Sequence, residues 1–186
     1  MSTRSTIAIL KLDGSVSSVY CHGDGYLSYN GIMLARHYQK VDKVKKLIGF
    51  GDLSSLDENV EAPVGTKHSF DSRAPGITTF YGRDRGETGI ESRPHESLEK
   101  YMTDGDFQQY DYVFDETKES WFLINHKTKK LQKLIPLLVK DKEITGDDRQ
   151  FLDNIKKSSV AVKLKTKMEQ EIPPKENAKK VKSIKV

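Results

Sequence analysis

A histidine and an aspartate two residues apart end the second predicted strand, in the run CHGDGY (residues 21–26). If their side chains share a hydrogen bond, Asp24 would orient the imidazole of His22 as a general base. Cys21 cannot form a catalytic dyad with His22, because neighbouring side chains of a strand point to opposite faces. The same residues are also typical of a turn, in which Asp24-Gly25 supplies a positive φ angle.

Two arginines lie in a second polar segment, YGRDRGE (residues 81–87), which follows a predicted strand. The forked donors of Arg83 and Arg85 suit a phosphate or a carboxylate. In the enzymatic alternative they would clamp an anion while His22 and Asp24 act as acid and base. Asp84 and Glu87 could instead neutralise the two arginines, which would leave a network of surface ion pairs.

Aromatic side chains gather near these polar segments. Five tyrosines fall at the predicted strand ends or in the helix between them: Tyr20, Tyr26, Tyr29, Tyr38 and Tyr81. Exposed tyrosines such as Tyr26, beside Arg36 and the 81–87 segment, would stack on bases while the arginines neutralise phosphates. The alternative is that the tyrosines are half-buried core residues with a polar tip.

The net charge of +4 is concentrated in the C-terminal segment. Residues 163–186 contain eight lysines and three glutamates, a balance of +5, whereas residues 1–162 carry 23 basic and 24 acidic side chains. Pro173-Pro174 and the lack of apolar periodicity predict that residues 159–186 are a largely disordered tail. Such a tail would bind phosphate backbones without sequence specificity, or it would only solubilise the protein. The lysines predicted to contact nucleic acid are Lys163, Lys165, Lys167, Lys179, Lys180 and Lys182.

Several classes of protein lack their usual markers in this chain. Walker A, GxGxxG and GxSxG motifs are absent, and His37, His68 and His95 have no recognised metal-ligand spacing. We therefore predict neither a metal nor a cofactor. The longest strongly apolar run, 134–139, is far shorter than the roughly 20 residues of a spanning helix. No apolar segment follows the first four residues, and the single cysteine, Cys21, precludes an intramolecular disulfide, so we expect a cytoplasmic protein.

The elements that would position these residues follow from periodicity and turn signals. Two β-branched runs, 5–12 and 15–22, flank Asp13-Gly14 and predict a hairpin; runs 110–115 and 120–125 predict a second one. Residues 77–81 form a further strand, 52–76 are expected to be a loop, and 131–139 should pack on the sheet. Helices are predicted over 28–38, 41–48, 95–102 and 147–157. The expected fold is a single α+β domain over 1–158, with a mostly antiparallel sheet packed by two to four helices.

The N-terminal half contains a series of distinctive segments: MSTRSTIAI (1–9), YCHGDGYLSYNG (20–31), GDLSSL (51–56), HSFD (68–71) and FYGRDRGE (80–87), with His37-Tyr38 between them. In these segments the chain resembles a group of small uncharacterised proteins of bacteriophages and prophages. The resemblance covers roughly residues 1–90 and, more loosely, the hairpin at 112–123. It implies phage origin and action in a host cytoplasm, and it implies no activity.

Three hypotheses for function remain open from the sequence. Binding is favoured over catalysis, and RNA or single-stranded DNA is favoured slightly over a host protein as the partner, because the charge is segregated and tyrosines accompany arginines. The second hypothesis is an inhibitor or adaptor that binds a host defence or transcription protein. The third is an enzyme that acts on a nucleotide-like phosphate compound. The sequence leaves the oligomeric state open.

Overall fold

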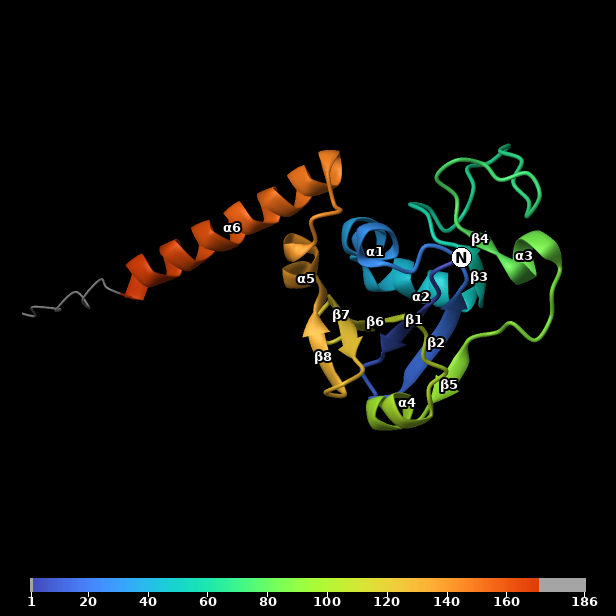
Figure 1. Ribbon diagram of the computed structural model, residues 1–186, viewed down its shortest axis with the longest axis horizontal. Helices are drawn as coiled ribbons and strands as arrows, with labels where there is room; N and C mark the ends of the chain where they lie inside the picture. Colours follow the sequence, from blue (N-terminus) through green and yellow to red (C-terminus); the bar gives the residue numbers. More distant parts are fainter. Residues whose placement is uncertain (1, 171–186) are drawn as a thin grey trace, which may run out of the picture.

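An eight-stranded sheet runs through the centre of the protein, flanked by helices on its two faces (Figure 1). The structure is a computed structural model that describes residues 2–170, with side chains described as far as residue 159. The strands are β1 (Ser5–Leu10), β2 (Val16–Cys21), β3 (Leu53–Ser55), β4 (Thr79–Phe80), β5 (Arg93–His95), β6 (Tyr110–Asp115), β7 (Ser120–Asn125) and β8 (Lys130–Lys133). Their order is β4-β3-β2-β1-β6-β7-β8, and β5 also pairs with β2.

Both predicted hairpins are present. β1 and β2 pair antiparallel around the turn at Gly14, whose φ of 85° favours glycine. β6 and β7 pair antiparallel with Phe114 opposite Trp121. The two hairpins are joined by a parallel pairing of β1 with β6, in which Ser5 lies opposite Tyr110. Most strand pairs are antiparallel, so the predicted α+β class with a mostly antiparallel sheet is confirmed.

The helices outnumber the two to four predicted. They are the π-helical turn η1 (Leu27–Gly31) and the helices α1 (Ile32–His37), α2 (Val41–Gly49), α3 (Tyr81–Arg85), α4 (Leu98–Asp104), α5 (Leu134–Lys140) and α6 (Gly146–Gln170). The additional helices α3 and α5 are short, and each directly follows a strand. They were not predicted because segments of this length are too brief to show a helical period. No helix in the described part of the chain is long and apolar enough to cross a membrane.

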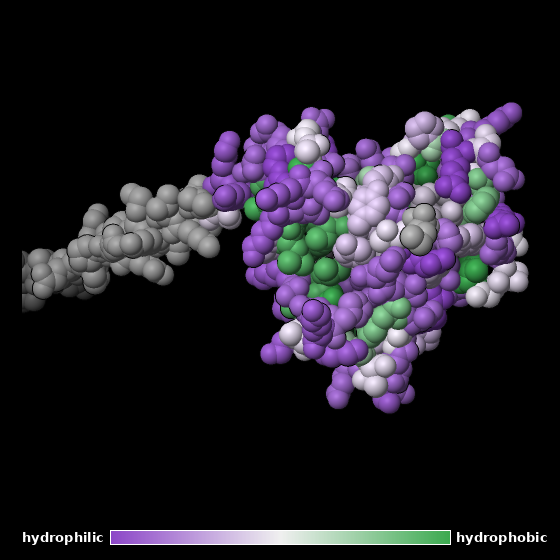
Figure 2. Space-filling model, in the orientation of Figure 1, coloured by the Kyte–Doolittle hydropathy of each residue, from purple (hydrophilic) through white to green (hydrophobic). Residues whose placement is uncertain are grey.

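The larger core lies on one face of the sheet, which we call the first face. Alternate strand residues such as Ile7, Val19 and Phe114 pack there against buried residues of α1, α2, α5 and α6. α2 shows why it packs there: Val44, Leu47 and Ile48 fall on one side of the helix and are buried, whereas its lysines lie on the other side. Figure 2 shows that apolar residues reach the surface near α5, while most of the visible surface is hydrophilic.

The second face of the sheet is covered less completely. A smaller apolar cluster joins Ala8, Val16 and Val113 to Tyr101 of α4. α4 begins at Ser97, whose hydroxyl accepts a hydrogen bond from the Lys100 amide, as an N-cap should. This cluster includes a single short helix.

Several predicted segments differ from the structure. The strand predicted over 77–81 is limited to β4, and Tyr81 is the first residue of α3. The expected loop at 52–76 contains β3, because Leu53 is buried between Cys21 and Phe80 in the sheet. Residues 93–95 form β5, so the helix predicted over 95–102 begins later, at Leu98. α6 extends to Gln170, and the helix therefore includes residues 159–170 of the segment predicted to be a tail. The remainder of that segment, residues 171–186, lies outside the described residues.

Candidate functional site

Polar and aromatic side chains line the second face of the sheet near the ends of β2, β3 and β4. Val19 and Cys21 point into the core, so the alternating residues Tyr20 and His22 point to the opposite face. Leu53 is likewise buried in the core, which directs Ser54 to the second face. The strand period therefore places one polar or aromatic residue from each neighbouring strand on a common surface.

One end of this surface is a hydrogen-bonded group of Arg4, Tyr20 and His22. The Arg4 Nε donates to the Tyr20 hydroxyl at 3.0 Å, and this hydroxyl lies 3.1 Å from the His22 Nδ1. Arg4 is exposed, and no carboxylate among the described side chains pairs with it. The group thus offers an unneutralised guanidinium beside two aromatic rings.

An ion pair fixes the strand that carries Tyr20. Asp52 accepts a hydrogen bond from the Tyr20 amide at 2.7 Å and binds both terminal nitrogens of Arg93, at 2.7 and 3.0 Å. The hydrogen bonds that Arg93 donates to Asp52 raise the pKa of Arg93. This bidentate pair is part-buried and joins β5 to the segment before β3, so it stabilises the surface around Tyr20.

The other end of the surface is a stack of Phe70 and Tyr81, whose ring centroids lie 5.7 Å apart with the planes 32° from parallel. Two guanidinium groups lie over the Phe70 ring, that of Arg73 at 5.0 Å and that of Arg85 at 4.7 Å. Arg73 is exposed and donates to the Ser54 hydroxyl at 3.2 Å. The Arg85 side chain is 54% exposed and lies 3.1 Å from Glu87.

The two ends belong to one surface. Ser54 joins them: its hydroxyl accepts a hydrogen bond from Arg73 at 3.2 Å, and its carbonyl accepts one from the amide of Gly23, next to His22, at 2.9 Å. We call this surface the arginine–aromatic face. It consists of Arg4, Tyr20, His22, Phe70, Arg73, Tyr81 and Arg85.

The predicted pair of His22 and Asp24 does not share a hydrogen bond in the described part of the chain. The His22 ring contacts Tyr20, whereas Asp24 has a φ of 52° and its carbonyl accepts a hydrogen bond from the Asn30 amide. The alternative interpretation of this segment, a turn with positive φ, is the geometry found. It gives His22 no carboxylate to orient it.

The Arg83 guanidinium is bound by other groups of the protein. It donates to the carbonyls of Val60 and Thr78 at 2.5 and 2.6 Å, and to the Asp84 carboxylate. Its side chain is only 24% exposed. β3 also lies between β2 and β4, so the strands that precede residues 22 and 83 are not neighbours. Arg83 therefore holds the 56–78 segment in place, and of the two predicted arginines only Arg85 lies on the arginine–aromatic face.

The remaining predicted residues lie elsewhere. Arg36 forms an ion pair with Asp148 at 2.6 Å, between α1 and α6. Tyr26 packs edge-on against Tyr29 at 6.3 Å, beside the turn at Asp24. Lys163, Lys165 and Lys167 lie in α6, whose side chains are described only as far as residue 159. Lys179, Lys180 and Lys182 lie outside the described residues.

Sequence reasoning missed three residues of the face: Arg4, Phe70 and Arg73. Arg4 has a usable signal, because the strand alternation places it on the same side as Thr6 and Ala8 of β1, which is the second face. Phe70 and Arg73 have none, because their loop reaches Tyr81 only through tertiary packing.

A second polar cluster was also missed, on the same face of the sheet near α4. The carboxylate of Asp111 is fully buried, accepts a hydrogen bond from the Thr6 hydroxyl at 2.5 Å and lies 2.9 Å from the His126 Nε2. Burial raises the pKa of Asp111. Thr6 in turn contacts the Tyr101 hydroxyl at 2.8 Å, so this network ties β1 and β6 to α4.

Metal ligands do not converge in the part of the chain whose side chains are described: no group of three His, Cys, Asp or Glu residues there could hold a metal ion. Cys21 is buried, and burial raises the pKa of its thiol to about 11, so the thiolate is scarce at neutral pH. Comparison of the chain with models of protein families, with curated proteins and with solved structures finds no match.

Proposed function

We propose that the protein binds RNA or single-stranded DNA without sequence specificity, as a non-enzymatic accessory protein that a bacteriophage produces in the host cytoplasm. The arginine–aromatic face would hold the bases and the nearest phosphates. The Lys-rich segment beyond residue 162 would add electrostatic affinity for the phosphate backbone. The phage origin in this proposal rests on the resemblance of residues 1–90 described above.

The observation that carries the proposal is the stack of Phe70 and Tyr81 with Arg73 and Arg85 beside it. Half-buried aromatic rings are stacking platforms for bases, worth about 1–3 kcal/mol per base. Arginines next to the rings supply both cation–π contact and phosphate neutralisation. A surface ion-pair network alone would not need the aromatic rings.

The extent of the face supports a single strand as the ligand. Tyr20 lies in β2, His22 directly follows β2, and Arg4 directly precedes β1. Phe70 lies in the loop between β3 and β4, and Tyr81 directly follows β4. A single strand could therefore contact aromatic rings at two separate places. A duplex presents its bases stacked and paired, and would offer its phosphates alone to such a surface.

Fluorescence anisotropy with a labelled oligothymidine and a labelled oligouridine tests this function. We expect binding to both, with an affinity that falls steeply as salt increases, because phosphate contacts release counterions. Replacing both arginines of the stack (Arg73→Ala with Arg85→Ala) should weaken binding to both oligonucleotides alike. Arg36→Ala is the matched control, because Arg36 pairs with Asp148 on the opposite side of the sheet.

The stacking contribution is separated by Phe70→Leu, which keeps an apolar side chain in the loop but removes the ring. We expect weaker binding with an unchanged salt slope, because the charge of the protein stays the same. Binding that is independent of salt, or equal losses of affinity in Arg36→Ala and in the double arginine variant, would refute a nucleic-acid site on this face.

A further inference from the structure

β8 is an edge strand of the sheet, at the end opposite to β4 (Figure 1). One side of β8 pairs with β7, with Leu131 opposite Ile124. Among residues 2–170, the backbone of β8 has no strand partner on its other side and makes no backbone hydrogen bond outside the sheet. An unpaired strand edge is able to accept an additional strand.

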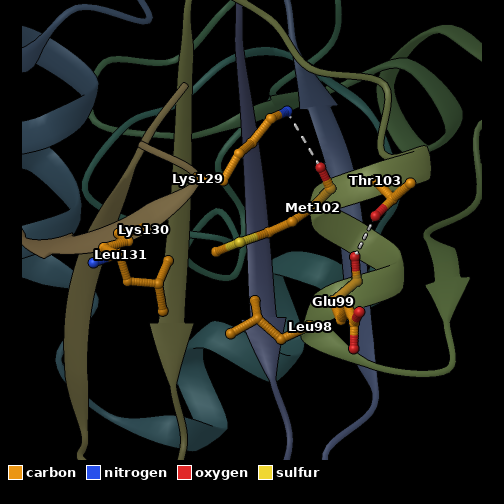
Figure 3. A pocket seen from close by; sticks show the side chains of 7 residues that line it. All are labelled: Leu98, Glu99, Met102, Thr103, Lys129, Lys130 and Leu131. Carbon is orange, nitrogen blue, oxygen red and sulfur yellow. Dashed lines mark hydrogen bonds between the residues drawn. The ribbon is translucent and has the colours of Figure 1, made fainter. Parts of the chain in front are cut away.

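An apolar groove of about 780 Å³ lies on the second face of the sheet, between β8 and α4. Figure 3 shows Leu131 of β8 and Leu98 and Met102 of α4 pointing toward this space. Lys129 crosses one end of the groove, where its ammonium donates to the Met102 carbonyl at 3.4 Å. The groove is therefore bordered by the unpaired strand on one side and by a helix on the other.

The edge carries a strong positive charge. The segment 126–133 (HKTKKLQK) contains four lysines and no acidic residue. Lys127, Lys129, Lys130 and Lys133 are exposed, and none of them forms an ion pair with a described side chain. The surface over β8 is accordingly hydrophilic in Figure 2. Lysines on an edge strand oppose the pairing of like strands, since two copies would bring the ammonium groups of both together.

We propose that β8 and the adjacent groove bind an extended acidic segment of another protein, which adds to the sheet as a strand. The backbone of the segment would pair with β8, and its alternate apolar side chains would pack on Leu131 and into the groove. Because the apolar side chains would face the groove with Leu131, its carboxylates would lie on the first face of the sheet, beside Lys130. The C-terminal residues 171–186 of this chain do not fit, because they contain five lysines and two glutamates.

A nucleic acid is the main competing ligand for a lysine-rich edge. Phosphates would satisfy the lysines, but they would leave the apolar groove and the unpaired backbone of β8 unused. The combination of strand edge, groove and charge therefore favours a peptide. The site is separate from the arginine–aromatic face, so the two proposals can fail independently.

The test uses the full chain, labelled with nitrogen-15, and three synthetic peptides. The first alternates valine and glutamate; the second replaces glutamate by lysine; the third keeps the first sequence but carries N-methyl groups on alternate backbone nitrogens. We expect the first peptide to shift the amide signals of β8 and to protect them from hydrogen exchange. The other two should bind at least about tenfold more weakly, since one cannot form the ion pairs and the other cannot form the backbone hydrogen bonds.

Matched variants locate the site. Lys130→Glu should weaken binding of the glutamate peptide, whereas Lys40→Glu, at an exposed lysine that precedes α2, should not. Leu131→Ala should weaken binding, and Leu12→Ala, whose side chain is 72% exposed at the β1–β2 turn, should have no effect.

Three outcomes would overturn the proposal. They are equal binding of the N-methylated peptide, signal changes confined to residues outside β8 and α4, and displacement of the glutamate peptide by oligothymidine at β8. The last outcome would assign the edge to nucleic acid. Loss of oligothymidine binding in the arginine variants, with peptide binding intact, would support two separate sites.

Discussion

The His68 Nε2 lies 3.3 Å from the Asp84 Oδ2, and both side chains are only 3% exposed. The other ring nitrogen of His68 accepts a hydrogen bond from the Ala74 amide at 3.0 Å. The proton of the neutral ring must therefore be on Nε2, which has no hydrogen-bond partner among the described residues. Asp84 also accepts a hydrogen bond from the Phe80 amide at 2.8 Å and pairs with Arg83. Asp84 also joins the long loop before β4 to α3, because its carbonyl accepts a hydrogen bond from the Phe70 amide at 3.0 Å.

Asp84→Asn should lower the free energy of unfolding by about 2–4 kcal/mol, because it removes the buried charge that pairs with Arg83. Urea denaturation at neutral pH measures the loss. Glu87→Gln is the control: its carboxylate is exposed, and the change should cost less than about 0.5 kcal/mol. Equal losses in the two variants would contradict the role given to Asp84.

The same carboxylate predicts part of the acid sensitivity. Burial acts to raise the pKa of Asp84, but the hydrogen bonds from Arg83 and the Phe80 amide outweigh it and hold the pKa below the ordinary value of 3.8. The stabilisation from a lowered pKa is complete above 3.8 and is lost as the pH falls through the lower, folded-state value. As the pH falls below 3.8, the free energy of unfolding should therefore decrease less in Asp84→Asn than in the wild type.

Asp111 predicts the opposite dependence on pH. Burial raises its pKa above 3.8, so its protonated form favours the folded state, and this contribution is lost as the pH rises from 3.8 through the folded-state value. Asp111→Asn is neutral throughout, so its stability relative to the wild type should increase from acid to neutral pH. Unfolding free energies across this range measure the change, with the exposed Asp106→Asn as control. A difference that does not vary with pH would contradict the raised pKa.

Gly51 and Gly49 form a matched pair for a backbone prediction. Gly51 has a φ of 79°, and a Cβ there would lie 2.3 Å from the Ile90 carbonyl oxygen, whereas a Cβ on Gly49 meets nothing within 4 Å. Gly51→Ala should therefore destabilise the protein by about 2–4 kcal/mol. Gly49→Ala, at the last residue of α2, should be neutral or stabilising by up to about 1 kcal/mol. Chemical denaturation compares them, and similar effects in both would refute the close approach to Ile90.

Deletion of residues 171–186 removes most of the Lys-rich segment and leaves the arginine–aromatic face intact. The deletion removes five lysines and two glutamates. We expect the affinity for oligothymidine to fall and its logarithmic salt slope to decrease by about 0.7 for each phosphate that is no longer neutralised. Binding should persist at low salt, because the face remains. Complete loss of binding at low salt would contradict the contribution of the face. An unchanged affinity would contradict the contribution of residues 171–186.

The elements built from local signals were predictable from the sequence. The hairpin of β1 and β2 follows from two β-branched runs around Asp13-Gly14, and the hairpin of β6 and β7 has the predicted bounds. α2 follows from the helical period of Val44, Leu47 and Ile48. These features depend on residues close in the chain, so turn chemistry and side-chain period suffice to indicate them.

The partners of the charged residues were not predictable in the same way. The segment around Arg83 predicts an anion clamp, but in the structure Arg83 donates hydrogen bonds to the carbonyls of Val60 and Thr78. Phe70 has no periodic signal, yet it forms the stack with Tyr81. Both outcomes depend on where the loop before β4 lies, which no local pattern encodes.

The order of amino acids alone establishes an α+β chain with two hairpins, a lysine-rich C-terminal segment and arginines close to aromatic residues. Which of these side chains meet is set by the three-dimensional fold. The parallel pairing of Ser5 with Tyr110 joins strands that are distant in the chain, and it leaves β8 as an edge and part of the second face polar. Pairing across such separations is set by the packing of the whole core, because many registers satisfy the local pattern and one buries all the apolar faces together.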